Sequence, residues 1–294
     1  MTAVLLIISA AMSGIVFFFT GLYTDWYWYF IPVLLIIPFY FIAFLIHVIL
    51  AGILGLFFSK KKPVEKPSKY FYTITVESLK QLLFFLRVRT RLTGIEKLPE
   101  GRFLAVYNHV SNFDPLVLVT QIPDRGIILV SKPENEKIPI VGKYMHMSGF
   151  LVIDRVSPIK AKKTVDKCAD WIKRDIASAA IAPEGTRSKD GRLLPFRAAP
   201  FSAAKKSGAP IVIITFRNTQ DIKKNFPLRT TKVEMDIADV IYPEQYAELN
   251  TMAISALVRE KMLSALGQVD SVRPDDSDKD LKSDAHTEGS GTEN

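Results

Sequence analysis

The chain has 294 residues, of which 48% are hydrophobic and 23% charged, and its formal net charge is +8. The hydrophobic residues are unevenly spread, since residues 1–58 contain a single Asp, Glu, Lys or Arg, namely Asp25. This distribution excludes a simple soluble protein. A multi-pass transporter is also excluded, because no later segment is comparably long and apolar. With one cysteine, Cys168, the chain cannot build a disulfide framework.

Two apolar segments open the chain. Residues 2–23 are long enough to cross a bilayer as a helix. Residues 30–58, interrupted by Pro32 and Pro38, exceed the ~30 Å hydrocarbon core and are expected to tilt or kink. The pair predicts a membrane-anchoring helical hairpin over residues 1–58. A cleaved signal peptide fits poorly because no Lys or Arg precedes the first segment, whereas a hairpin embedded in one leaflet stays an alternative.

A basic segment follows the hairpin. Residues 59–92 are expected to form a basic linker and an amphipathic helix, Tyr70–Arg91, that lies on the membrane face, packs on the next domain, or does both. Positive residues stay on the cytoplasmic side. We therefore expect an integral protein of the cell membrane with its catalytic domain and both termini in the cytoplasm. An anionic membrane lipid is the expected partner, rather than nucleic acid, because the cations cluster beside the anchor.

The remainder predicts an α/β domain over residues 93–267, with a single sheet flanked by helices. The expected strands are Phe103–Tyr107, Ile127–Val130, Phe150–Ile153, Ala179–Ala182, Ile211–Phe216 and Lys232–Ile237. Helices are expected at Pro158–Asp175, Phe201–Lys206 and Ile254–Leu266. Residues 268–294 contain 8 acidic and 3 basic residues. They are expected to form a disordered acidic tail.

A histidine and an aspartate form the first chemical motif. His109 ends an apolar strand, and Asp114 follows five residues later, before Pro115. A carboxylate that holds one imidazole nitrogen leaves the other nitrogen as a base. The alternative is that Asp114 only caps the following helix. The surrounding residues carry no nucleophile motif, so a basic His109 would activate a hydroxyl group of the substrate.

A turn rich in charge forms the second motif. Glu184, Gly185, Thr186 and Arg187 follow a strand, and a glycine turn with an arginine is suited to a phosphate group. The alternative is a charged surface hairpin. Lys132 is a candidate second cation for that phosphate. Asp154 and Arg155 form either a structural ion pair or part of the acceptor pocket.

Together these segments resemble the 1-acylglycerol-3-phosphate acyltransferase family. The family's four blocks correspond to Asn108–Asp114, Gly149–Arg155, Glu184–Arg187 and Pro210–Val212. Ala198 and Ile213 depart from the family pattern, which bears on acceptor and chain-length preference.

The resemblance implies an acyltransferase fold behind a membrane-associated N-terminus. It implies that His109, oriented by Asp114, deprotonates the sn-2 hydroxyl of lysophosphatidate, which attacks an acyl thioester and gives phosphatidate. The donor would be acyl-CoA or acyl-acyl carrier protein, with no metal or redox cofactor. The acceptor would be bound by residues near its phosphate: Lys132, Arg155, Glu184, Gly185, Thr186 and Arg187. A different acceptor, such as glycerol 3-phosphate or another lysophospholipid, and a non-catalytic lipid-binding protein are the alternatives.

Overall fold

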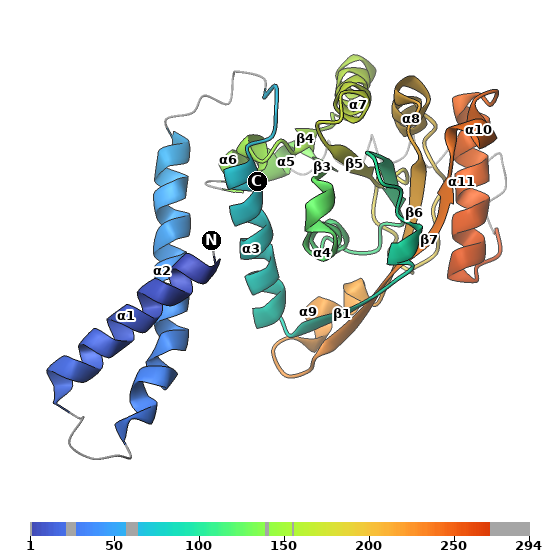
Figure 1. Ribbon diagram of the computed structural model, residues 1–294. Helices are drawn as coiled ribbons and strands as arrows, with labels where there is room; N and C mark the ends of the chain where they lie inside the picture. Colours follow the sequence, from blue (N-terminus) through green and yellow to red (C-terminus); the bar gives the residue numbers. More distant parts are fainter. Residues whose placement is uncertain (1, 22–27, 57–63, 139–140, 155, 271–294) are drawn as a thin grey trace, which may run out of the picture. The chain divides into compact units, whose positions relative to one another are not determined.

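The chain divides into two compact units, Met1–Pro63 and Val64–Asn294, called here the N-terminal and C-terminal units. This computed structural model describes residues 2–21, 28–56, 64–138, 141–154 and 156–270 (Figure 1). Of the residues singled out above, Asp25, Arg155 and the tail beyond residue 270 lie outside the described parts.

The N-terminal unit is a pair of apolar helices. Helix α1 spans Thr2–Thr20 and α2 spans Phe30–Leu56, with Pro38 inside it. Both helices are long and apolar enough to cross a membrane. They pack on each other, and Ser13 donates a hydrogen bond from its hydroxyl to the carbonyl of Pro32. The two predicted apolar helices are thus present and in contact, as a hairpin requires.

A seven-stranded mixed sheet forms the centre of the C-terminal unit, in the order β1-β7-β6-β2-β5-β3-β4. Strands β6, β2, β5, β3 and β4 run parallel to one another, whereas β7 runs antiparallel to β6 and β1 runs parallel to β7. Their bounds, in sheet order, are Val88–Thr93, Thr231–Ile241, Ile211–Arg217, Leu104–Tyr107, Ser178–Ile181, Ile127–Ser131 and Leu151–Val152.

Helices cover both faces of this sheet, which is why β2 and β5 are buried along their whole length. Helices α3 (Lys69–Phe85) and α4 (Asp114–Gln121) form one layer, and α7 (Pro158–Lys173), α8 (Ser202–Ser207) and α11 (Thr251–Leu266) form the other (Figure 1). The shorter helices are α5 (Pro133–Lys137), α6 (Val141–Met147), α9 (Ile222–Asn225) and α10 (Pro243–Tyr246).

Several helix ends follow directly from local sequence. The Ser157 hydroxyl accepts the Lys160 N–H ahead of Pro158, and the Asn250 side chain accepts the Ala253 N–H. Both are standard N-caps. Helix α11 ends at Gly267, whose φ of 67° is left-handed. The helices predicted at Pro158–Asp175, Phe201–Lys206 and Ile254–Leu266 therefore end within a few residues of their expected positions.

The predicted helix Tyr70–Arg91 was wrong over its last part. Helix α3 ends at Phe85, and residues 88–93 form strand β1, which pairs with β7. The strand alternates half-buried with exposed residues, so the arginines at its exposed positions produced the amphipathic pattern assigned to a helix. Because α3 buries Phe71 and Ile74 and contacts α4 and α6, the helix packs on the C-terminal unit.

The expected start of the acidic tail also shifts. Gln268 accepts the Leu193 N–H through Oε1 at 2.9 Å and donates from Nε2 to the Gly191 carbonyl at 2.9 Å. Asp270 forms an ion pair with Arg259. These contacts assign residues 268–270 to the folded unit rather than to a tail.

Candidate active site

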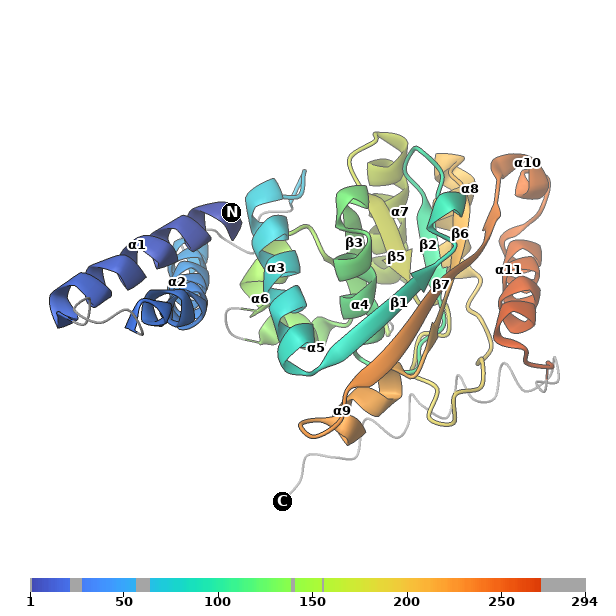
Figure 2. The same cartoon turned by 60° about the horizontal axis from the view of Figure 1, so that its bottom comes forward.

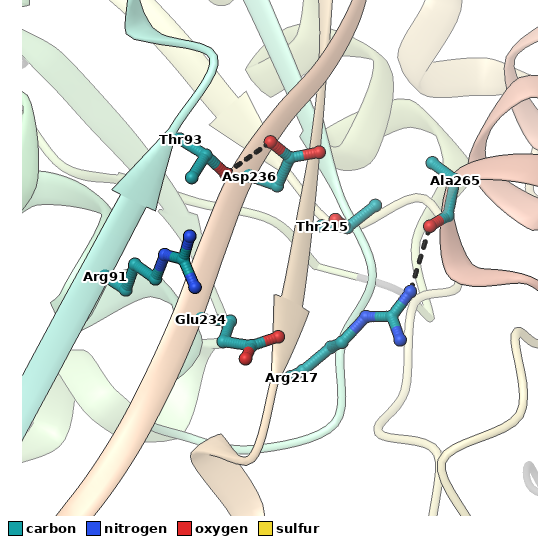
Figure 3. Close-up of a pocket in the computed structure, with 7 residues that line it drawn as sticks. All are labelled: Arg91, Thr93, Thr215, Arg217, Glu234, Asp236 and Ala265. Carbon is teal, nitrogen blue, oxygen red and sulfur yellow. Dashed lines mark hydrogen bonds between the residues drawn. The ribbon is translucent and has the colours of Figure 1, made fainter.

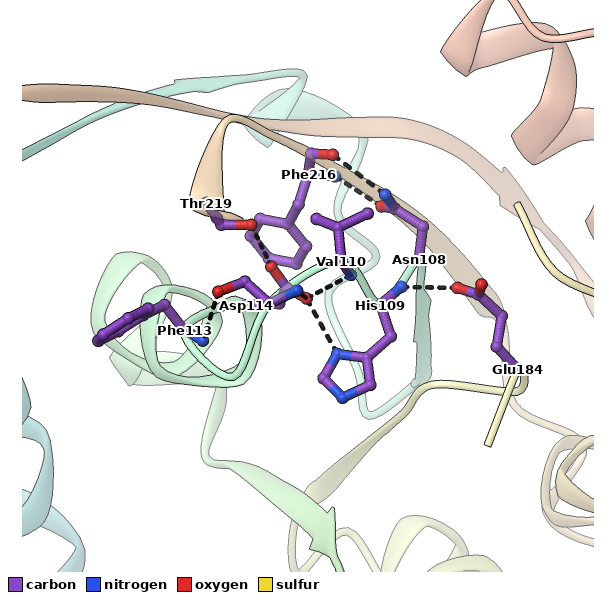
Figure 4. Close-up of polar contacts among 9 residues, drawn as sticks. Asn108, His109, Val110, Phe113, Asp114, Glu184, Phe216 and Thr219 are labelled. Carbon is purple, nitrogen blue, oxygen red and sulfur yellow. Dashed lines mark hydrogen bonds and ion pairs between the residues drawn. The ribbon is translucent and has the colours of Figure 1, made fainter. Parts of the chain in front are cut away.

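The loop between β2 and α4 is fixed from its first residue. Asn108 is buried and exchanges two hydrogen bonds with the backbone of Phe216 on β6, donating to the carbonyl at 3.0 Å and accepting the N–H at 2.7 Å (Figure 4). A side chain that satisfies both backbone groups of a neighbouring strand acts as a cross-link. The end of β2 is therefore held against β6 at the point where the loop begins.

Asp114 is completely buried as the first residue of α4. Its Oδ2 accepts the Val110 N–H at 2.9 Å and the Ser111 N–H at 2.7 Å, and it lies 2.9 Å from Nδ1 of His109. Its Oδ1 accepts the hydroxyl of Thr219. The carboxylate thus bonds the preceding loop rather than the N–H groups of α4, so it does not serve as the helix cap that was the alternative interpretation.

The contact with Asp114 defines the state of the His109 ring. A carboxylate beside Nδ1 favours the tautomer with the proton on Nδ1, which leaves a lone pair on Nε2. That second nitrogen points away from Asp114 (Figure 4), and 16% of the side chain is exposed. The imidazole ring and the ring of Tyr107 form a T-shaped contact. The geometry provides a partly exposed, oriented imidazole that can accept a proton.

Glu184 joins two loops through its carboxylate. Its Oε1 accepts the His109 N–H at 2.6 Å, and its Oε2 accepts the Leu194 N–H at 2.9 Å. Burial raises the pKa of this carboxyl group to about 7, against the opposing effect of the two backbone hydrogen bonds. Both oxygens accept backbone N–H groups, so these contacts position the His109 loop. The family resemblance implied instead that Glu184 binds the acceptor.

Gly185 occupies a position that other residues fit poorly. Its φ is +74°, and a Cβ atom there would lie 2.8 Å from Nε of Arg197. The next two residues, Thr186 and Arg187, are exposed. Ser188 then returns to the His109 loop, where its N–H donates to the His109 carbonyl at 2.8 Å. The structure therefore brings the turn 184–188 alongside His109 and leaves the Arg187 guanidinium open to solvent.

The other predicted cations are less closely tied to this centre. Lys132 is exposed at the start of α5, directly after β3, and among the described residues no hydrogen bond or ion pair connects it with His109 or Asp114.

Asp154 accepts the Val156 and Ser157 N–H groups and pairs with Lys160 at 3.3 Å. These bonds, led by the one from Ser157, lower the pKa of Asp154.

Thr219 and Arg197 are site residues that the sequence did not indicate. Thr219 is buried beyond the end of β6, 105 residues from the Asp114 it bonds. Arg197 lies against Gly185 with an exposed side chain. No local pattern marks a lone threonine as a partner of a distant carboxylate, whereas Arg197 could have been noticed as an arginine in the chain segment following the Glu184 turn.

A separate polar cavity of about 340 Å³ lies on the face of β1, β7 and β6 (Figure 3). Its side chains form cross-strand rows, with Glu234 level with both Arg91 and Arg217, and Asp236 level with both Thr93 and Thr215. Ala265 completes the lining. None of these residues belongs to the His109 centre. The two arginines and two carboxylates cancel in formal charge, so the cavity carries no preference for an anion.

Residues 89–217 match the protein family described as Acyltransferase. This range contains the whole His109–Asp114–Glu184 arrangement. The family model thus covers the segment that holds the candidate site, and less than half of the chain.

Similar acyltransferases occur in plants and bacteria. The chain is 36% identical over 136 residues to the chloroplastic 1-acyl-sn-glycerol-3-phosphate acyltransferase BAT2 of Brassica napus. This aligned region covers 46% of this chain and 39% of that protein. It is 28% identical to the 1-acyl-sn-glycerol-3-phosphate acyltransferase of Haemophilus influenzae (64% and 78% covered) and 29% identical to that of Escherichia coli (64% and 76% covered). The match thus spans less than half of the plant relative and about three quarters of the bacterial ones.

The crystal structure of the 1-acyl-sn-glycerophosphate acyltransferase PlsC from Thermotoga maritima has the same fold. It superposes with a TM-score of 0.55 at 22% identity and covers 68% of this chain and 80% of that one. The acyltransferase family fold, a mixed sheet flanked by helices, is therefore confirmed.

Proposed function

We propose that this acyltransferase moves a fatty acyl group from acyl-CoA or acyl-acyl carrier protein to the sn-2 hydroxyl of 1-acyl-glycerol 3-phosphate, producing phosphatidate. The observation that carries the proposal is the buried Asp114 carboxylate 2.9 Å from Nδ1 of His109, with the other ring nitrogen accessible. The names of the bacterial and plant relatives, all 1-acyl-sn-glycerol-3-phosphate acyltransferases, support the choice of acceptor.

The reaction needs a base because a lipid hydroxyl is a weak acid. In the proposed mechanism Nε2 of His109 takes the proton from the sn-2 hydroxyl as its oxygen attacks the thioester carbonyl carbon. The new C–O bond forms, the C–S bond breaks, and the leaving thiolate receives the proton from the imidazolium. Asp114 accepts Nδ1–H throughout and stabilises the imidazolium that develops. The protein forms no covalent intermediate and uses no metal or redox cofactor.

Binding of the acceptor phosphate is assigned to the exposed cation beside this centre. Arg187 lies three residues after Glu184, whose carboxylate holds the His109 N–H, and its guanidinium is suited to bidentate contact with phosphate. Gly185 and Thr186 shape the turn that carries it. Lys132 and Arg155 are proposed as further contacts of the phosphate, and the family resemblance is the support for both. Glu184 is proposed to act indirectly, by positioning the loop.

The lipid substrates imply a membrane setting. Helices α1 and α2 are proposed to hold the protein in the cell membrane, with the C-terminal unit and both termini in the cytoplasm. Anionic lipid is the proposed partner of the basic residues that follow the hairpin. Protease added to the outer face of intact cells should leave the C-terminal unit uncut, and cleavage there would contradict the topology.

An acyl-transfer assay of purified protein tests the function. Lysophosphatidate is supplied with acyl-CoA and acyl-acyl carrier protein, beside glycerol 3-phosphate and other lysophospholipids as rival acceptors. His109→Ala should lower kcat by ~10²–10⁴-fold. Asp114→Asn should be nearly as damaging, because an amide can hold the wrong tautomer.

His146→Ala is the matched control. His146 is also only partly exposed and lies 4.0 Å from a carboxylate oxygen of Glu136, yet it has no proposed role in the reaction. Its variant should retain activity close to wild type. A folded His109→Ala protein that kept more than about a tenth of the wild-type rate would contradict the mechanism.

A further inference from the structure

Two segments that are far apart in sequence meet at one end of the C-terminal unit. The end of α3 continues through Arg87 into β1, and α9 continues through residues 226–230 into β7. Arg87 donates from Nη1 to the Pro227 carbonyl at 3.5 Å, and its own carbonyl accepts the Thr231 N–H at 3.1 Å. The two segments lie side by side in both ribbon views (Figures 1 and 2). We call residues 84–89 and 223–229 together the basic tip.

Large apolar side chains project from the basic tip. Phe84 is 68% exposed, Phe226 47% and Leu228 84%. Phe84 belongs to the first segment, and Phe226 and Leu228 belong to the second. Both segments therefore contribute exposed apolar side chains to the basic tip. Apolar groups that gather on a surface with a polar rim are typical of a protein or membrane contact.

Within the two segments the charge is entirely positive. Residues 84–89 and 222–230 contain no Asp or Glu. The exposed cations are Arg87, Arg89, Lys223, Lys224 and Arg229. Apolar residues surrounded by cations match the boundary of an anionic bilayer, where the apolar groups enter the acyl region and the cations meet lipid phosphates. A symmetric contact between two copies would bring ten cations together and is disfavoured by repulsion.

The basic tip is connected to the candidate active site by a short piece of chain. Thr219, which donates to Asp114, lies four residues before Lys223. Between them, Ile222 is fully buried and fixes the start of α9 in the core. The basic tip thus follows closely on the end of β6, beside the end of β2 from which the His109 loop begins.

We propose that the basic tip is a docking surface for anionic lipid, separate from the N-terminal hairpin. Docking would turn the sheet edge with the His109 loop toward the membrane that holds the lipid substrates. The hairpin keeps the chain in the bilayer, and the basic tip orients the C-terminal unit on the bilayer surface. This inference concerns lipid contact and does not require acyl transfer, so it stands or fails separately from the proposed reaction.

A fluorescent probe on the full-length protein in vesicles tests the docking. Leu228→Cys is labelled with a polarity-sensitive fluorophore, and Met252→Cys on α11, where the native residue is 74% exposed, is the matched control. The native Cys168 should not react, because it is buried and burial raises the pKa of its thiol to about 12. Vesicles contain phosphatidylcholine with or without phosphatidylglycerol, and a spin-labelled lipid serves as quencher.

The probe at residue 228 should shift to the blue and be quenched in phosphatidylglycerol vesicles, whereas the probe at residue 252 should stay in water. Each cation near an anionic surface contributes roughly a 5-fold preference for it. The variant Lys223→Glu/Lys224→Glu/Arg229→Glu should therefore abolish most of the quenching at residue 228. High salt should also reduce the quenching at residue 228, because it screens the attraction between the cations and the anionic lipid.

Two results would overturn the proposal. One is a probe at residue 228 that is as accessible to an aqueous quencher in phosphatidylglycerol vesicles as the probe at residue 252. The other is a blue shift of the residue 228 probe in detergent without vesicles that increases with protein concentration, which would identify the basic tip as a contact between protein molecules.

Discussion

The hydroxyl of Thr219 provides a specific test of how the candidate site is held together. Thr219→Val removes only the donor to Oδ1 of Asp114 and keeps the branched shape of the side chain. Because Thr219 and Asp114 are both completely buried, water cannot replace the lost donor. One carboxylate oxygen is left without its partner, and the carboxylate is then held against Nδ1 of His109 only by the contacts of Oδ2.

The expected fall in kcat follows from the type of hydrogen bond that is lost. A hydrogen bond from a neutral donor to a charged acceptor contributes roughly 1.5–3 kcal/mol. If all of it serves to hold Asp114 against the imidazole in the transition state, kcat falls roughly 10- to 150-fold. The Michaelis constants for the acceptor and the donor should change little, because Thr219 is completely buried and acts through Asp114.

Two further variants make the measurement interpretable. Thr120→Val removes a hydroxyl that is also buried, on the same helix as Asp114, but that hydroxyl donates only to the Val117 carbonyl at 2.8 Å. Thr219→Ser keeps the donor and should recover most of the activity. Steady-state acyl transfer is measured for all three variants beside their thermal unfolding midpoints. A Thr219→Val kcat within about 2-fold of Thr120→Val would refute the positioning role, since even the weakest expected effect is larger.

Three other predictions concern the neighbouring loops and the chain end. Burial in the folded state raises the pKa of Glu184 to about 7. The contribution of Glu184 to the free energy of unfolding is therefore greatest at low pH, and it falls by up to about 3 kcal/mol as the pH rises from the pKa of the unfolded state to 7. Wild type should therefore lose stability relative to Glu184→Gln between pH 5 and pH 8 in detergent melts; the opposite trend would contradict the burial argument. Arg187→Ala should raise the acceptor Michaelis constant ~10-fold or more, the loss of a charge-assisted bond, and Lys189→Ala nearby is the control; an effect on the donor constant alone would reassign Arg187. Truncation after Asp270 should leave activity near wild type, whereas truncation after Gly267 should lower the melting temperature because Gln268 bonds the Leu193 loop; equal melting temperatures would show that those bonds contribute nothing.

The sequence predicted those parts of the molecule that local patterns determine. Apolar runs gave the helices of the hairpin and six of the strands. The five-residue spacing of His109 and Asp114 suggested their contact, because a loop of that length between a strand and a helix can fold back on itself. Each of these inferences needs only a few neighbouring residues.

The features that the sequence did not indicate depend on distant pairings. Strand β1 exists because β7, more than 140 residues later, supplies the one strand that pairs with it in the described parts of the chain. The contact of Thr219 with Asp114 depends on where β6 ends beside β2. The positioning role of Glu184 depends on contacts with two other loops, through the N–H groups of His109 and Leu194. Within its own segment, a glutamate before Gly-Thr-Arg suggests a residue that binds substrate.

The two carboxylates at the end of β2 also affect the entropy of substrate binding. Asp114 and Glu184 between them accept the backbone N–H groups of three consecutive residues, His109, Val110 and Ser111. Ordering a loop when a ligand arrives usually reduces affinity, by roughly 1–2 kcal/mol for each backbone residue that becomes fixed. Here that ordering is completed when the chain folds, so binding of the proposed acceptor does not have to supply it.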